Sequence, residues 1–261
     1  MTPDIVVDIG NTRLKWGLCR PTGVTTVARL ESQPEAWDER RTAWRDQVEA
    51  GARRPWKWAI ASVVPNVRRA FAEWVERHGD AALVLDHFEQ LPIRVDVEAP
   101  ERVGLDRLLT AVAANRRHPD RPAVLIDAGT TVTVDWLEAE TFRGGTIFPG
   151  FALMAKALND FTAQLPLVTM PERFIAPPGK ATTAAMQAGI VWSIAGGMLA
   201  VTRDYVRRSG SSPAVFLTGG DAPAFGRLLV EWAHDDPSIP SPIIWPEQTL
   251  EGIRWAAEAQ P

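Results

Sequence analysis

Carboxylate, hydroxyl and lysine side chains are grouped near the start of the chain in a pattern that suits phosphate binding. The segment Asp4–Leu18 contains an apolar run that ends at Asp8, a polar Gly-Asn-Thr turn and a second apolar run that includes Lys15. A Gly-Asn turn lets backbone N–H groups face an anion, and the threonine hydroxyl and lysine ammonium add donors. Asp8 could bind a divalent cation or one of its waters. Taken alone, the stretch fits a phosphate-and-metal site or an ordinary hairpin turn about equally well.

The same pattern returns about half a chain later. VVDIGNTRLKWGL, which starts at Val6, and LIDAGTTVTVDWL, which starts at Leu125, share an apolar strand, a DxGxT turn and a second strand. The second copy places Asp127 where the first has Asp8. Such a repeat in matched context indicates an internal duplication. Two such hairpins facing each other across a cleft could hold the phosphates of a nucleotide with a metal between them.

Two further segments carry candidate functional residues. Asp106 falls in the first turn of an expected helix that ends near Asn115, where the helix dipole stabilises an acidic side chain whatever its function. The TGGD sequence of Thr218–Asp221 follows an apolar strand, and its glycines would let a purine ring or ribose approach the backbone. Taken alone, however, the two glycines fit a plain strand-to-helix turn better. Together the four signals favour a nucleotide-using enzyme.

The expected secondary structure places these motifs at the ends of strands. The first half predicts the order β-β-β-α-β-α-β between Ile5 and Leu85. The second half repeats this order with helical insertions, so we expect two lobes, 1–118 and 119–261. Its expected strands are 123–126, 132–137, 141–148, 215–217 and 243–244. Its expected helices are 151–165, a long helix capped by Thr182 or Thr183, 223–232 and 250–257. The Pro-rich segment 166–180 is expected to be an exposed loop. Leu153 and Phe161 are expected on the buried side of the 151–165 helix.

The composition is that of a soluble globular protein. Apolar residues make up 46% of the chain and charged residues 23%, and 28 basic against 32 acidic residues give a net charge of −4. An acidic chain with pI ≈ 5.7 argues against a general nucleic-acid-binding surface. The tryptophans that stand among charged residues, namely Trp37, Trp44, Trp56, Trp58 and Trp74, are therefore expected to fill the core. Cys19, the one cysteine, is expected to be a buried thiol. No signal peptide is evident, and Ala188–Val201 is short and glycine-rich for a membrane span, so we expect a cytoplasmic protein with no membrane partner.

The motifs resemble those of the actin, sugar kinase and Hsp70 ATPase superfamily and, within it, type III pantothenate kinases, including the homologues called Bvg accessory factors. The segments that carry the resemblance are DIGNTRLKWG (8–17), VGLDR (103–107), IDAGTT (126–131), GGTIFPG (144–150) and GKATTAAMQAGI (179–190). It implies an α/β fold of two duplicated ribonuclease H-like lobes with a nucleotide cleft between them. It also implies a homodimer and the first step of coenzyme A biosynthesis, the ATP-dependent phosphorylation of pantothenate to 4′-phosphopantothenate.

The resemblance assigns roles to individual residues. The ATP-binding residues that it implies are Asp8, Ile9, Gly10, Asn11, Thr12, Arg13, Leu14, Lys15 and Thr130. The pantothenate-binding residues that it implies are Gly104, Leu105, Asp106, Arg107 and Thr182. Asp106 would be the general base and Arg107 would pair with the substrate carboxylate. Mg²⁺ would bind the phosphates near Asp8, and Asp127 would be the ligand of a monovalent cation, K⁺ or NH₄⁺.

One position departs from the family pattern. Val97 stands seven residues before the glycine of the GxDR motif, where members often carry an aromatic residue, so another side chain is expected to complete that wall of the substrate pocket. Two alternatives stay open at this point: a kinase for another small alcohol, and a regulatory protein that keeps the kinase fold but acts through a partner or DNA. The intact Asp8, Asp106 and Asp127 favour catalysis, because a purely binding protein needs no general base.

Overall fold

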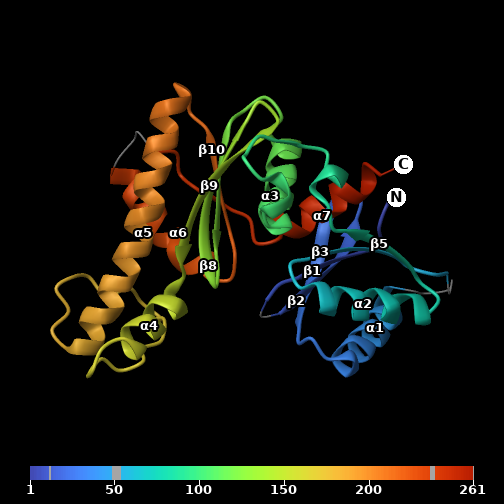
Figure 1. Ribbon diagram of the computed structural model, residues 1–261, viewed down its shortest axis with the longest axis horizontal. Helices are drawn as coiled ribbons and strands as arrows, with labels where there is room; N and C mark the ends of the chain where they lie inside the picture. The colour runs from blue at the N-terminus through green and yellow to red at the C-terminus, as the bar shows by residue number, and fades with distance from the viewer. Residues whose placement is uncertain (12, 49–53, 236–238, 261) are drawn as a thin grey trace. The chain divides into compact units, whose positions relative to one another are not determined.

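The chain forms two compact units in the computed structural model, which describes residues 1–261 except 12, 49–53, 236–238 and 261 (Figure 1). Unit 1 comprises Met1–Arg117 and Glu247–Pro261, and unit 2 comprises His118–Pro246. The expected boundary after residue 118 lies one residue from the observed division. The expected second lobe of 119–261 differs in one respect, because the last helix, α7 (Gln248–Glu258), belongs to unit 1. It packs there on α3 (Leu105–Arg117) and on the first sheet.

Unit 1 is built on a five-stranded sheet in the order β3-β2-β1-β4-β5. The strands are β1 (Ile5–Ile9), β2 (Leu14–Arg20), β3 (Gly23–Leu30), β4 (Lys57–Ser62) and β5 (Ala81–Leu85). The first three pair antiparallel, and β4 and β5 run parallel to β1. With α1 (Pro34–Val48) before β4 and α2 (Pro65–Arg77) before β5, the predicted order β-β-β-α-β-α-β is confirmed. Short elements follow at η1 (Phe88–Gln90), β6 (Arg94–Val95) and η2 (Pro100–Arg102).

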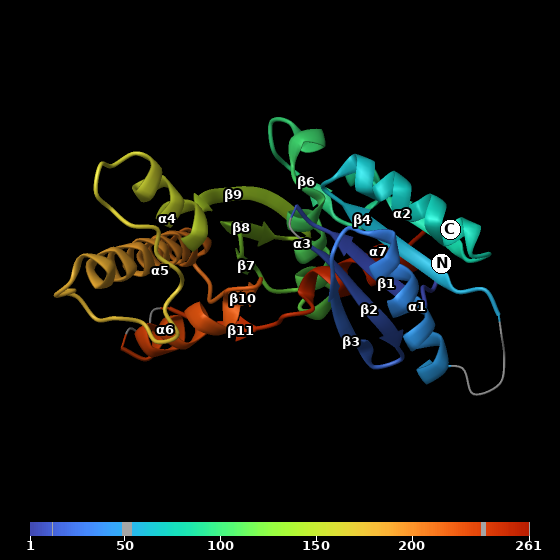
Figure 2. The same cartoon turned by 90° about the horizontal axis from the view of Figure 1, so that it is seen from below.

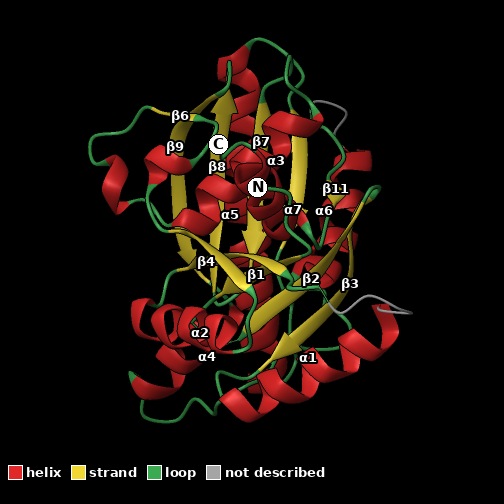
Figure 3. Ribbon diagram, turned by 90° about the vertical axis from the view of Figure 1, so that its right-hand side faces the viewer, coloured by secondary structure: helices red, strands yellow, loops and turns green. Residues whose placement is uncertain are grey.

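The two faces of this sheet are covered by different helices, with α1 and α2 on one and α3 and α7 on the other (Figure 3). Alternate residues of β1, such as Ile5 and Val7, pack among the aromatic side chains of α1 and α2. Val6 points the other way: together with Leu250 of α7 it lies over Gly17 of β2. Because side chains alternate along a strand, Asp8 and Lys15 share the face of Val6 and Gly17.

Tryptophans fill the core under α1 and α2, as the sequence predicts. Trp16 is fully buried, and its ring centroid lies 5.0 Å from that of Trp58, 5.4 Å from Phe71 and 5.9 Å from Trp44. These edge-on contacts add to the burial of large apolar surface. Cys19, in contrast, is only half-buried, and burial raises the pKa of its thiol to about 12.

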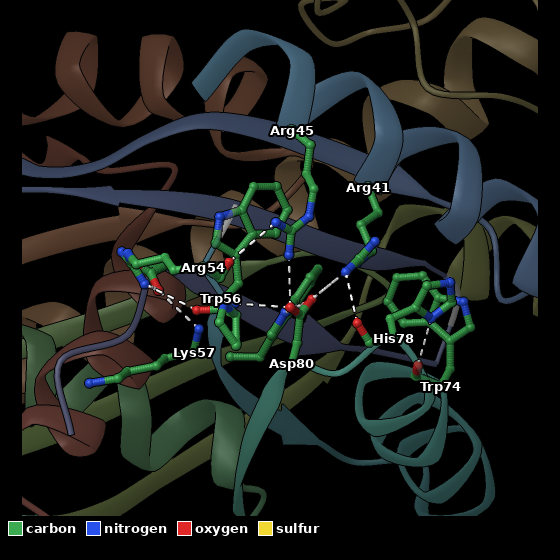
Figure 4. A network of polar contacts seen from close by, with 11 residues as sticks. Arg41, Arg45, Arg54, Trp56, Lys57, Trp74, His78 and Asp80 are labelled. Carbon is green, nitrogen blue, oxygen red and sulfur yellow. Dashed lines mark hydrogen bonds and ion pairs between the residues drawn. The ribbon is translucent and has the colours of Figure 1, made fainter. Parts of the chain in front are cut away.

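The buried carboxylate of Asp80 connects several elements on the α1–α2 face of the sheet (Figure 4). Asp80, just before β5, accepts hydrogen bonds from Arg41 Nε at 3.0 Å and Arg45 Nη2 at 2.8 Å, both on α1. It also accepts from the backbone N–H of Trp56 at 2.9 Å and the indole N–H of Trp58 at 3.1 Å. A buried carboxylate with two guanidinium partners and two further donors has its hydrogen-bonding needs met. Asp80 therefore joins α1, β4 and β5.

Unit 2 repeats the strand order of unit 1. Its strands are β7 (Ala123–Ala128), β8 (Thr131–Glu138), β9 (Thr141–Pro149), β10 (Ala214–Thr218) and β11 (Ile243–Ile244). They lie in the order β9-β8-β7-β10-β11, with the same antiparallel and parallel pairings as β3-β2-β1-β4-β5. The helices α4 (Phe151–Asp160), α5 (Thr182–Ser209) and α6 (Ala222–Asp235) accompany this sheet (Figure 2). The shared topology supports the duplication inferred from the repeated motif.

The helix expected at 151–165 is shorter than predicted. It ends at Asp160, and Phe161, expected on the buried side, is 87% exposed, while Leu153 is 41% exposed. The chain leaves the helix at Phe161, well before Pro166, which disfavours a helical conformation only for Leu165. The expected cap of α5 is also wrong: Ala181 occupies that position without a side-chain cap hydrogen bond.

Among the described residues, α5 is the one helix long and apolar enough to cross a membrane by length and composition. Its most apolar window has a mean hydropathy of 1.5, and 39% of that window is buried. Its buried side, which includes Met186, Ile190, Ile194 and Met198, packs in the core of unit 2. Core helices of soluble proteins meet the same criteria, so length and composition do not assign this helix to a membrane.

Candidate active site

The β1–β2 hairpin carries the first group of predicted site residues. Asp8 of β1 lies opposite Lys15 of β2 in the strand register. The N–H of Gly10 donates a hydrogen bond to the carbonyl of Arg13 at 3.1 Å and closes the turn. Ile9 and Leu14 are fully buried in the core, so only their backbone groups could contact a ligand. Asn11 and Arg13 are exposed, and Thr12 lies outside the described residues.

Asp8 is held in an electrostatically unfavourable position. Burial raises its pKa to about 6 from an ordinary value of 3.8; the Lys15 ammonium opposes this rise and the Asp106 carboxylate adds to it. The influence of Asp106 shows that the two carboxylates, far apart in the sequence, lie close enough to interact within unit 1. The structure thus gathers Asp8, Lys15 and Asp106 on the α3–α7 face of the first sheet.

The first turn of α3 positions Asp106 and Arg107. The N–H of Arg107 donates to the carbonyl of Gly104 at 3.1 Å and to Asp106 Oδ1 at 2.9 Å. A Cβ added to Gly104 would lie 2.5 Å from Asp106 Oδ1, so a side chain at 104 would displace this carboxylate. Gly104, Leu105, Asp106 and Arg107 are all half-buried, whereas the next turn is fully buried. The helix therefore begins at the protein surface and presents its N-terminal residues there.

The β7–β8 hairpin of unit 2 resembles the first hairpin but is not a copy of it. Asp127 is half-buried near the end of β7, and the N–H of Gly129 donates to the carbonyl of Thr131 at 3.0 Å. Two residues separate β7 from β8, against four between β1 and β2. The exposed Thr130 lies at the tip, where its carbonyl accepts a hydrogen bond from the N–H of Gly150 at 3.0 Å. This hydrogen bond joins the tip of the hairpin to the residue before α4.

The TGGD loop lies over the end of β7, beside Asp127. The N–H of Asp221 donates to the carbonyl of Ala128 at 2.8 Å. Gly219 has a φ of 103°, and a Cβ there would overlap both the Ala128 carbonyl oxygen and Asp127 Oδ1, so this position requires glycine. Burial raises the pKa of Asp221. The sequence pattern identified this loop, but Asp221 itself was not among the predicted site residues.

Thr182 lies apart from these strand ends in the sequence, in the first turn of α5. Its side chain is exposed, and the helix N-terminus offers backbone N–H groups without intrahelical partners.

Among the described residues, no three His, Cys, Asp or Glu side chains converge as a ready metal site. A metal bound beside one of the predicted carboxylates would take ligand phosphates or water as further ligands.

Comparisons with known proteins identify a family and a fold. The family model described as type III pantothenate kinase matches residues 5–204. A type III pantothenate kinase from Akkermansia muciniphila is 33% identical over 97% of each chain. Among solved structures, a conserved Baf family protein from Campylobacter jejuni matches with a TM-score of 0.58 at 14% identity, covering 97% of each chain. Component A of (R)-2-hydroxyglutaryl-CoA dehydratase from Acidaminococcus fermentans matches with a TM-score of 0.52 at 13% identity, covering 98% of this chain and 96% of that one.

The structural likenesses, at low identity, show the fold alone: a mixed α/β chain with two sheets, of the actin-like ATPase and sugar kinase type. The family match and the full-length relative go further, because both bear the pantothenate kinase name. The fold and family predicted from the motifs are thereby confirmed, and the chain belongs to the type III pantothenate kinase family.

Proposed function

We propose that this protein transfers the γ-phosphoryl group of ATP to the primary hydroxyl of pantothenate, giving 4′-phosphopantothenate and ADP. The observation that carries the proposal is the grouping of Asp8, Lys15 and Asp106 on one face of the first sheet, in a chain of the pantothenate kinase family. A phosphate-binding lysine beside a carboxylate on a helix N-terminus is a suitable arrangement for phosphoryl transfer to an alcohol.

Asp106 would serve as the general base. Its carboxylate accepts the hydroxyl proton of pantothenate while the hydroxyl oxygen attacks the γ-phosphorus in line, and the bond to the ADP oxygen breaks. Asp106 lies in the first turn of α3, where its side chain is half-buried. Arg107 is placed next to it and would pair with the pantothenate carboxylate, with Gly104, Leu105 and Thr182 completing the substrate contacts.

The phosphates of ATP would be bound by the hairpin donors and Lys15, and Thr130 would supply a further ATP contact. Mg²⁺ fits beside Asp8, because a divalent cation would relieve the unfavourable burial of this carboxylate near Asp106. When bound, Mg²⁺ stabilises the charge that develops on the transferred group. Asp127, at a turn rich in backbone oxygens, offers the oxygen donors that a hard monovalent cation such as K⁺ takes; NH₄⁺ could donate to the same oxygens. We also propose, from the family resemblance, a homodimer in the cytoplasm.

A coupled ADP-release assay with ATP, Mg²⁺, K⁺ and pantothenate tests the proposal. We expect ADP release that depends on pantothenate, and D106N should lower kcat by about 10²–10⁴-fold while ATP binding survives. The exposed Asp120, changed to asparagine, is a matched control that should retain activity. ADP release that ignores pantothenate would contradict the proposed substrate, and near-normal turnover of D106N would remove Asp106 from the role of base.

A further inference from the structure

The C-terminal helix α7 contacts two parts of unit 1 through different faces. Gln248 and Gly252 are one helical turn apart and face α3. Leu250 and Glu251 lie between them in sequence and face the sheet. The helix is therefore placed between the element that carries Asp106 and the strands that carry Asp8 and Lys15.

On the α3 side, the backbones of α7 and α3 are in close contact. A Cβ at Gly252 would overlap the carbonyl oxygen of Leu109 and would lie 2.6 Å from its carbonyl carbon. Gln248, which is fully buried, donates from Nε2 to the carbonyl of Thr110 at 3.0 Å. Thr110 in turn donates its hydroxyl to the carbonyl of Arg107 at 2.7 Å. These contacts lie one turn after Asp106, in the buried part of the same helix.

On the sheet side, α7 is fixed to β2 and β3. The Leu250 Cδ1 lies 3.2 Å from where a Cβ of Gly17 would be, and Gly17 is two residues after Lys15 on β2. The buried Glu251 accepts a hydrogen bond from the N–H of Val24 at 2.6 Å through Oε1. The Leu250 contact holds α7 against β2 of the β1–β2 hairpin, and the Glu251 contact holds it to β3, which pairs with β2. The position of α7 therefore fixes the spacing between this hairpin and α3.

We propose that Gly252 and Gln248 are positioning residues that set the location of Asp106 relative to Asp8 and Lys15. The proposal rests on the proposed function, in which the hydroxyl held by Asp106 must align with a phosphate held at the hairpin. A misplacement of about 1 Å in such a geometry can lower the rate by about 10²-fold. Because α7 is held to the sheet by Leu250 and Glu251, a methyl group at Gly252 moves α3, and Asp106 with it, away from the hairpin.

The first test compares G252A with G196A. Both changes add one methyl group inside a helix, but a Cβ at Gly196 would meet nothing within 4 Å, so G196A is the matched control. We expect G252A to lower kcat by about 10- to 100-fold with KM for ATP within about twofold of the wild type. G196A should leave both constants unchanged. A kcat of G252A within twofold of the wild type would overturn the proposal, as would a loss explained entirely by weaker ATP binding.

The second test asks whether Gly252 acts through Asp106. In a D106N background the proposed base is already absent, so adding G252A should lower the remaining kcat by less than about twofold, whereas the same change should lower the kcat of the wild type by about 10- to 100-fold. Equal fold losses in the two backgrounds would overturn the proposal. Q248M, which removes the hydrogen bond to Thr110, should give the same non-additive result and carries the test if G252A does not fold. Failure of the wild type to phosphorylate pantothenate would instead contradict the proposed function.

Discussion

Replacing Asp8 by asparagine should stabilise unit 1 while impairing ATP use. An aspartate whose folded-state pKa is raised binds its proton more tightly in the native than in the unfolded state, so its contribution favours folding at low pH and is lost as pH rises. For Asp8 the relevant window runs from the ordinary value of 3.8 to about 6. At about 1.4 kcal/mol per pH unit, the ionised carboxylate destabilises the fold by about 3 kcal/mol at pH 7.

The prediction is a pH-dependent difference between D8N and the wild type. Asparagine has the shape of the protonated acid but carries no charge, so D8N should be up to about 3 kcal/mol more stable at pH 7, and the gain should vanish near pH 4. Urea unfolding followed by tryptophan fluorescence suits this measurement, because the buried tryptophan cluster around Trp16 and Trp58 lies in unit 1. The difference between the two proteins removes the contribution of the other titrating groups.

The outcome that refutes this reasoning is a pair of stability curves that stay parallel from pH 4 to pH 7.5. Mg²⁺ and ATP provide an independent check. If a cation offsets the cost of ionising Asp8, they should stabilise the wild type more than D8N at pH 7. For the same reason kcat/KM for ATP of the wild type should fall as pH drops through about 6, because the protonated carboxyl no longer attracts the cation.

Two further substitutions test the structural reading. G219A forces a φ of 103° on alanine and places a methyl group against the Ala128 carbonyl oxygen. It should destabilise unit 2 by roughly 1–3 kcal/mol and weaken the binding of a fluorescent ATP analogue. G220A is the control and should do neither, because a Cβ at Gly220 would meet nothing within 4 Å. D80N leaves two partly buried guanidinium groups without their carboxylate, so it should lower the free energy of unfolding in urea by about 3–5 kcal/mol. R54A removes an exposed ion pair and should lower it by at most about 1 kcal/mol. Equal effects of D80N and R54A would contradict the role assigned to the buried network.

The strand order was predictable because it depends on local patterns. Short apolar runs that end at Asp8 and Asp127, each followed by a glycine turn, define both hairpins without knowledge of what they pack against. The end of α4 was not predictable in the same way. The apolar spacing continues through Phe161, yet the chain leaves the helix at that residue and its side chain lies in solvent, which the spacing alone does not indicate.

The relation between Asp8 and Asp106 could not be predicted from the residues themselves, because it depends on how α3 packs against the first sheet. The placement of α7 has the same origin. The segment that forms α7 follows unit 2 directly in the sequence, yet the helix packs in unit 1. There Gly252 contacts the backbone of α3, and Gln248 donates a hydrogen bond to the carbonyl of Thr110. Family resemblance supplied Asp106 as a candidate base, but no local pattern indicated the two α7 residues that hold its helix.

The two faces of the first sheet have opposite energetic roles, and this difference explains how Asp8 is tolerated. On the α1–α2 face, the tryptophan cluster and the fully satisfied Asp80 stabilise the fold. On the α3–α7 face, ionisation of Asp8 costs stability, chiefly because burial desolvates its carboxylate and to a smaller extent because Asp106 lies near it. An unfavourable arrangement of this kind persists where the surrounding structure holds it rigidly. The close backbone contact of Gly252 with α3 provides that rigidity on this face, so the packing of α7 and the costly charge of Asp8 are parts of one arrangement.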